Sequence, residues 1–304
     1  MSHRDDLREA ADALGGSVAV CGLGAYADRL AGAEFRDARC ATAAELLAEG
    51  PSVGDRGPAS EGAGAPASPT EPAAVVVALD PDDVDGVGEV SETLRALADR
   101  DAFAVAVVPA AAADEDALSP VRESVGAVVV AEDDAVEAAI RAFLATVQEP
   151  GFVNLDLTDA ETVLSAGVAA LGTGTADRDA PAAAVAGAFD GLPAGVDATD
   201  ASAVLVDVVV DPDTSVTAAT DVIAAVRGRI GADANVIWGG AVDEAAADEL
   251  AVRLVVAGVR HAPPLTAGDP CPRCGASLSA YEFGARETLS CDGCGYSGIA
   301  VRRG

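Results

Sequence analysis

The sequence predicts an α/β fold: a parallel sheet in an N-terminal domain, a second α+β domain, and a small cysteine-rich module at the C-terminus. Short apolar runs rich in Val and Ala alternate with stretches of helical spacing, which is typical of a parallel sheet covered by helices. Half of the 304 residues are hydrophobic, which is enough for a sizeable core, although only 3% are aromatic. Four of the six cysteines lie close to the C-terminus.

The N-terminal domain is expected over residues 1–149. A short helix is predicted at 4–14, followed by a buried strand at 17–22, a turn at Gly22 and Gly24, and a helix to about residue 30. Strand, glycine turn and helix begin many nucleotide-binding domains, so this pattern favours a Rossmann-like domain. An ordinary strand–helix turn has the same pattern and stays an alternative.

The rest of this domain continues the alternation. Residues 51–72 are rich in Pro, Gly, Ala and Ser without an apolar run, so we expect a disordered insertion there. Apolar runs and helical spacings predict strands at 73–79, 102–108 and 126–130 and helices at about 89–100 and 133–147.

The second domain is expected over residues 150–262 as a two-layer sandwich of a sheet packed on helices. The patterns predict helices at 160–171, 219–230 and 243–250 and strands at 203–210, 235–239 and 251–257. The sole tryptophan, Trp238, is expected in the core.

A polar segment at residues 150–159 joins two helical patterns. It contains Asn154, Asp156 and Asp159, a group that can orient a water molecule or hold a cation. The same residues also suit a turn that caps a helix, with Thr158 or Asp159 at the N-cap. The spacing alone leaves both interpretations open.

The stretch Asn154-Leu155-Asp156-Leu157-Thr158-Asp159 resembles the Asn-x-Asp-x-x-Asp loop of the FtsZ branch of the tubulin superfamily. The resemblance continues in the family's order over residues 150–258, through the stretches at 167–175, 177–179, 203–207, 234–240 and 248–250. In that family the loop enters the nucleotide site of a neighbouring subunit, where its acidic residues help to position the water that attacks GTP. The resemblance therefore implies FtsZ/tubulin-like partner subunits and an action of the loop in trans.

The same resemblance implies that the chain's own nucleotide site is degenerate. The family places Gly-Gly-Gly-Thr-Gly-Thr-Gly after the strand equivalent to 73–79, and its backbone amides cradle the phosphates. Here Asp82, Asp83 and Asp85 interrupt the pattern, and only Gly86 and Gly88 remain. At roughly 5 Å and an effective dielectric near 20, one like-charge pair costs about 3 kcal/mol. We expect no GTP binding; an unusual metal–nucleotide site is the alternative.

The C-terminal module is expected over residues 266–304 as a zinc ribbon. Cys271 and Cys274 form one Cys-x-x-Cys knuckle, and Cys291 and Cys294 form a second one. Four thiolates satisfy a structural tetrahedral zinc site and leave no position open for catalysis. Disulfides are disfavoured in a cytosolic chain, and the few basic residues of the module favour protein over nucleic acid as its partner.

Charge and hydropathy limit the partners and the cellular compartment that we expect for this protein. The formal net charge is -31, and all 19 basic residues are Arg, so contact with nucleic acid or anionic membranes is disfavoured. The spread of acidic residues is typical of a salt-rich cytoplasm, which suggests a halophilic archaeon. The polar start gives no sign of a signal peptide, and no apolar run reaches the ~18 residues of a membrane span. We expect a cytoplasmic protein.

Three functions remain open. The first is a cytoskeletal or cell-division protein that has lost its own GTP site and regulates or scaffolds a filament through the acidic loop and the zinc ribbon. The second is an active, polymerising GTPase. The third is a zinc-ribbon adaptor on an FtsZ-like scaffold. The first implies no autonomous GTPase activity, with a contribution of the loop to hydrolysis in trans.

Overall fold

The computed structural model describes residues 18–36, 38–48, 72–83, 87–99, 102–113, 115–246, 248–261, 265–271, 273–283 and 286–299. The helix expected at 4–14, almost all of the insertion expected at 51–72, and Asp85 and Gly86 lie outside these residues. The chain forms two compact units, residues 1–261 and 262–304. The first is called the body and the second the ribbon unit.

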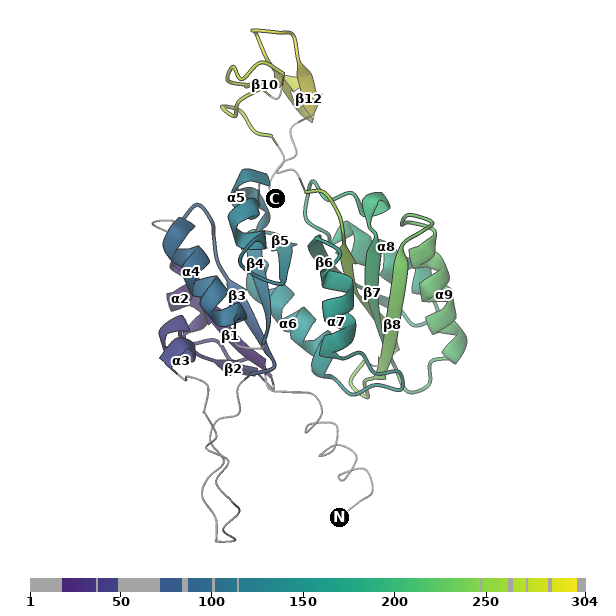
Figure 1. Cartoon of the computed structure of the whole chain (residues 1–304). Coiled ribbons are helices and arrows are strands. Elements are labelled where there is room, and N and C mark those ends of the chain that lie inside the picture. The colour runs from purple at the N-terminus through teal and green to yellow at the C-terminus, as the bar shows by residue number, and fades with distance from the viewer. Residues whose placement is uncertain are drawn as a thin grey trace. The chain divides into compact units, whose positions relative to one another are not determined.

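The described residues of the body form one nine-stranded mixed sheet (Figure 1). Strand β9 runs antiparallel to both of its neighbours, β6 and β7, and every other adjacent pair is parallel. In spatial order the strands are β2 (Ala38–Cys40), β1 (Val18–Gly22), β3 (Ala74–Ala78), β4 (Phe103–Pro109), β5 (Ala127–Ala131), β6 (Val168–Asp177), β9 (Glu249–Ala257), β7 (Ala203–Val210) and β8 (Asn235–Val242).

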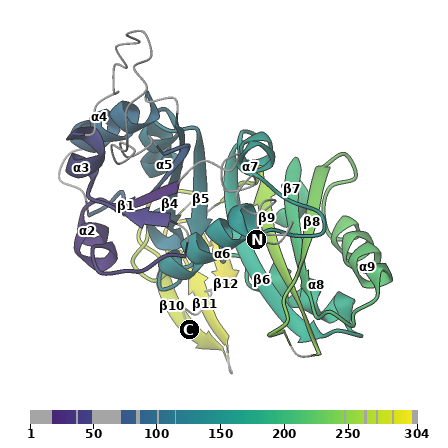
Figure 2. The same cartoon turned by 90° about the horizontal axis from the view of Figure 1, so that it is seen from below.

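Helices cover both faces of this sheet because successive strand residues point to opposite sides. One face packs against α2 (Ala25–Leu30), α6 (Val136–Gln148) and α7 (Leu157–Leu164). The other face packs against α3 (Ala43–Ala48), α4 (Val87–Ala98), α5 (Glu115–Arg122), α8 (Pro181–Asp190) and α9 (Val216–Arg227). Figure 2 shows α2 beside β1 and α9 at the opposite end of the sheet. The predicted α/β class is confirmed.

The helix expected at 160–171 is wrong in its second half. Helix α7 ends at Leu164, and residues from Val168 onward form the long strand β6. Gly167 has φ 136°, a conformation that breaks the helix between them. The run from Val168 to Leu171 is buried on both sides of the sheet, and a short apolar run of this kind is ambiguous between helix and strand.

The helix expected at 243–250 is also wrong. The described residues at 243–248 form turns, and β9 already begins at Glu249. The carboxylate of Asp243 accepts a hydrogen bond from the amide of Ala245 at 2.8 Å, which favours a turn. Asp248 has φ 67° and therefore cannot continue a right-handed helix.

The domain boundary expected at residues 149 and 150 stays a prediction. It falls between α6 and α7, and the sheet continues past it because β5 and β6 pair in parallel from Val128 and Val168 onward. The ribbon unit contains a separate antiparallel sheet of β10 (Ser279–Phe283), β11 (Arg286–Ser290) and β12 (Ser297–Ile299).

Candidate functional site

The place where a nucleotide would bind follows from the strand order. Strand β1 lies between β2 and β3, so the chain leaves β1 toward one side of the sheet and later extends the sheet on the other. Open α/β sheets bind ligands at such a switch point, outside the carboxyl ends of the strands. Gly22 ends β1 there, and Gly24, with φ 57°, precedes α2. The first glycine turn and the segment after β3 thus meet at the expected edge.

Asp83 occupies this meeting point. Its Oδ2 accepts a hydrogen bond from the backbone amide of Ala25, the first residue of α2, at 2.9 Å. Asp80 in turn accepts one from the amide of Asp82 at 2.9 Å. Gly88 is the second residue of helix α4. A carboxylate of the chain therefore faces the amide that a bound anion would face at the start of a helix.

Negative charge dominates the surroundings of that turn. Asp133, which follows β5, accepts a hydrogen bond from the amide of Ala111 at 2.8 Å. Burial raises the pKa of the Tyr26 hydroxyl, the nearby charge of Arg29 lowers it, and the charges of Asp80 and Asp133 raise it further. The Arg29 guanidinium lies 4.6 Å from the centre of the Tyr26 ring. Such a field disfavours a polyphosphate.

The acidic loop forms the cap of α7. Asp156 is the N-cap residue, and its Oδ1 accepts a hydrogen bond from the amide of Asp159 at 2.9 Å. Asp159 reciprocates by accepting one from the amide of Asp156 at 3.2 Å, which completes a capping box. The side chain of Asn154 accepts from the amide of Gly151 at 2.8 Å. The expected N-cap at Thr158 or Asp159 is therefore corrected to Asp156, and the three candidate catalytic residues lie together in one short segment.

Two adjacent glycines of β8 receive the loop. Val153 and Gly240 exchange both backbone hydrogen bonds, at 3.2 and 2.9 Å. A Cβ on Gly239 would lie 2.5 Å from a side-chain carbon of Leu155, and one on Gly240 would lie 2.4 Å from the ring of Phe152. The loop thus packs directly on the backbone of β8, and side chains at these positions would lift it off the sheet.

An ion-paired group beneath the loop was not found from the sequence. Arg253 of β9 contacts Asp207 of β7 at 2.9 Å and Glu149 at 2.8 Å, and Glu149 is the residue between α6 and the loop. We call these three residues the ion triad. Asp207 is 5% exposed, and burial raises its pKa while the charge of Arg253 lowers it. The signal in the sequence was a charged residue in the middle of each of two apolar runs, Asp207 in β7 and Arg253 in β9.

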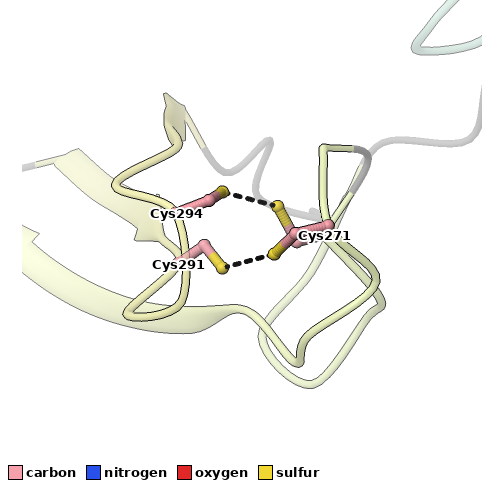
Figure 3. Close-up of side chains that lie close together, drawn as sticks. Cys271, Cys291 and Cys294 are labelled. Atoms are coloured by element: carbon pink, nitrogen blue, oxygen red, sulfur yellow. Dashed lines mark hydrogen bonds between the residues drawn. The ribbon is translucent and has the colours of Figure 1, made fainter.

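The four cysteines of the ribbon unit converge on one point (Figure 3). All four sulfur atoms lie within 4.8 Å of one another, with Cys271 and Cys294 at 3.6 Å and Cys274 and Cys291 at 3.5 Å. A tetrahedral zinc with ~2.3 Å bonds to sulfur requires edges of about 3.8 Å, so the group fits such an ion. It is the one group of potential metal ligands found among the described residues.

The backbone of both knuckles supports a metal centre. The amide of Gly275 donates to the carbonyl of Cys271 at 2.8 Å, and that of Gly295 donates to Cys291 at 2.9 Å. Burial opposes ionisation of Cys271, but hydrogen bonds from the backbone of Arg273 and from neighbouring groups outweigh it and lower its pKa to about 7.

The two cysteines of the body and the tryptophan are buried or half-buried in the fold. Burial raises the pKa of the Cys21 thiol to about 12, so it is unreactive at neutral pH. Cys40 is half-buried and donates to the carbonyl of Ala33 at 3.0 Å. Trp238 is half-buried and packs against the apolar cluster that includes α9, so it lies at the edge of the core in which it was expected.

The part of the chain from β6 to β9 is similar in sequence to known proteins. A sequence model of the FtsZ family C-terminal domain matches residues 167–260. The cell division protein FtsZ 1 of Halobacterium salinarum is 36% identical over 144 residues, which are 45% of this chain and 36% of that protein. The chain thus spans about a third of the length of the curated relative that it matches.

Solved structures extend the similarity to most of the fold. An empty FtsZ dimer from M. jannaschii matches 89% of this chain and 100% of that chain, with a TM-score of 0.63 and 19% identity. A GTPγS-bound CetZ2 protofilament from Haloferax volcanii matches 63% of this chain and 66% of that chain, with a TM-score of 0.51 and 20% identity. Within the described part of the chain, no helix has the length and apolar character needed to span a membrane.

Proposed function

Because the chain belongs to the FtsZ/tubulin superfamily, we propose that it regulates or scaffolds a filament of that superfamily and has lost its own GTP site. The hydrogen bond from the Ala25 amide to the Asp83 carboxylate carries this proposal. It joins the two segments that a phosphate would bridge at the switch point. A nucleotide would have to displace this contact and sit among several carboxylates, with Arg29 as a nearby positive charge.

The acidic loop supports the partner half of the proposal. Asn154, Asp156 and Asp159 keep the family's spacing, and the capping box uses one oxygen of each carboxylate. We propose that this loop meets the nucleotide-bearing end of an FtsZ/tubulin-like subunit in the cytoplasm and positions water or a cation on the partner's GTP. The protein would thus contribute to hydrolysis in trans without being an autonomous GTPase.

We further propose that the ribbon unit holds one structural zinc ion through Cys271, Cys274, Cys291 and Cys294. Four thiolates favour zinc over the oxygen-seeking ions magnesium and calcium. A closed set of four ligands excludes hydrolytic chemistry at the metal, so the ribbon would serve contact with another protein.

Calorimetry with GTP tests the loss of the nucleotide site. The full chain is titrated with GTP and magnesium in molar salt, since the net charge of -31 requires screening. We expect no binding at micromolar nucleotide. A clear one-to-one isotherm would instead favour the active GTPase, the alternative function that the superfamily fold allows.

A second experiment separates the filament regulator from a zinc-ribbon adaptor. The wild-type chain and a chain truncated after residue 261 are offered to the FtsZ-type protein of the same host. The regulator requires that both bind, because the acidic loop belongs to the body. Binding by the full chain alone would make the ribbon the working surface.

A further inference from the structure

We infer that the ion triad Glu149–Arg253–Asp207 fixes the position of the acidic loop on the sheet before any partner binds, with Arg253 as the positioning residue. Glu149 directly precedes residues 150–159, and its carboxylate bonds the guanidinium of Arg253 at 2.8 Å. The relevance of this loop position to GTP turnover rests on the function proposed above. The inference that the ion triad fixes the loop is independent of that function.

The residues that hold the loop lie in one row across neighbouring strands of the sheet. Arg253 of β9 faces Asp207 of β7, and Asp207 faces Gly239 of β8. Adjacent strands are about 4.8 Å apart, so the row spans about 10 Å across the sheet. Glu149 bonds Arg253 at one end of the row and Leu155 packs on Gly239 at the other. The loop therefore crosses the strands above this row.

Burial makes the row a rigid base. The side chain of Asp207 is 7% exposed and that of Arg253 is 19% exposed, whereas Glu149 is 31% exposed at the rim. Arg253 cannot swing away to follow Glu149, because doing so would leave the buried Asp207 without its partner. Movement of the start of the loop must instead break the bond between Glu149 and Arg253. A preorganised loop loses less conformational freedom when it meets a partner.

Hydrogen exchange of the loop amides tests the inference with Glu149→Ala. This variant removes the bond of Glu149 to Arg253 and its 4.0 Å contact with the exposed Arg36, and it leaves Asp207 paired with Arg253. The matched control is Glu137→Ala. Glu137 is likewise ion-paired, to Arg141 at 2.6 Å, but it lies in the first turn of α6, whereas Glu149 follows the last residue of that helix. We expect about tenfold faster exchange in residues 149–156 of Glu149→Ala, with no change in the control or in β9. Unchanged exchange in the loop overturns the inference.

A second variant removes the buried pair as a unit. Arg253→Met with Asp207→Asn leaves no unpaired buried charge, so the fold is retained. It should show the same faster exchange at residues 149–156. The single variant Arg253→Lys should keep part of the protection, because its ammonium group retains the positive charge and can still donate hydrogen bonds. Full protection in the double variant overturns the assignment of Arg253.

GTP turnover of the host's FtsZ-type protein then reports the consequence. If the wild-type chain stimulates turnover, Glu149→Ala should reduce that stimulation several-fold while Glu137→Ala does not. Equal stimulation by both variants, despite faster loop exchange, would deny that loop position matters to the partner. If the wild-type chain has no effect on turnover, the proposed action in trans fails, whereas the exchange result still decides the role of the triad.

Discussion

Asp207 shows how one buried carboxylate makes stability depend on pH. Burial raises its pKa in the folded chain above the ordinary value of about 3.9, despite the nearby Arg253. Folding therefore favours the protonated form. Its contribution to stability is fully present below the unfolded pKa and is lost as pH rises through the folded pKa. The difference in unfolding free energy, wild type minus Asp207→Asn, should fall in denaturant titrations as pH rises above the unfolded pKa of about 3.9; a rise would contradict the assignment.

Removing the counter-charge alone should cost far more than removing the pair. Arg253→Met leaves Asp207 buried without its 2.9 Å partner, and breaking a buried pair in this way typically costs about 3–5 kcal/mol. Equilibrium unfolding in high salt measures the loss. Adding Asp207→Asn should recover most of it, and failure of that rescue would show that Arg253 contributes mainly through packing.

At the scale of single residues, the sequence predicted the convergence of the four cysteines but not the contacts between residues far apart in the chain. The four cysteines were identified by spacing alone, because a Cys-x-x-Cys turn brings both sulfurs together locally. The bond between Asp83 and Ala25 joins residues 58 positions apart, and the ion triad joins strands whose neighbour relation depends on the whole sheet. No local pattern encodes such contacts.

At the scale of elements, the fit of the loop on β8 depends on its two glycines. A Cβ on Gly239 would lie 2.5 Å from Leu155 and 2.8 Å from the carbonyl of Val153. Gly239→Ala should therefore displace the loop and cost about 1–3 kcal/mol. Gly32→Ala is the control, since a Cβ there meets nothing within 4 Å. Equal stability of the two variants would mean that the loop shifts without cost.

The ribbon unit should depend on its metal. Among its described residues, the buried core contains Leu278 and Leu289 besides Cys271 and Cys291, with Leu265 and Tyr296 packed against it, which is a small core for an independent fold. Structural zinc supplies roughly 10–16 kcal/mol of apparent binding energy in small modules. Chelation, or Cys291→Ser, should unfold residues 262–304 and leave the body intact in proteolysis and circular dichroism, whereas Cys40→Ser should not. Absence of zinc from protein purified under reducing conditions would contradict the assignment.

Strands with unbroken apolar runs and helices with a long apolar face were predicted well. Very short elements, and apolar runs that suit both a helix and a strand, were not. The strands expected at 73–79 and 203–210 match β3 and β7, because fully buried strands read as continuous apolar runs. Strand β6 was assigned partly to a helix, since its first half is equally apolar and its second half alternates with exposed residues. Strand β2, with three residues, gives almost no signal.

At the scale of the whole molecule, the acidic loop and the proposed loss of the nucleotide site would make the two ends unequal. Under the proposed function, a subunit that offers Asn154, Asp156 and Asp159 but carries Asp83 at its own switch point would add to a nucleotide-bearing filament end and would offer no working site to the next subunit. Heterologous contacts extend a filament only when both surfaces work. We therefore predict end-capping at substoichiometric amounts, seen as shorter filaments of the host's FtsZ-type protein. Unchanged length across a wide ratio would contradict it.

The proposed action of the loop on GTP hydrolysis can be tested separately from the capping of filament ends. The substitutions must preserve helix α7, because Asp156 is its N-cap residue. Asparagine caps helices about as well as aspartate, so Asp156→Asn with Asp159→Asn should preserve α7 while removing both charges. If the carboxylates position water or a cation on the partner's GTP, this variant should lose the stimulation of turnover and still shorten filaments. Replacement of both by Ala should also destabilise the helix start, by about 1 kcal/mol. If the Asn variant stimulates GTP turnover as much as the wild type does, the loop only binds the partner and its charges take no part in hydrolysis.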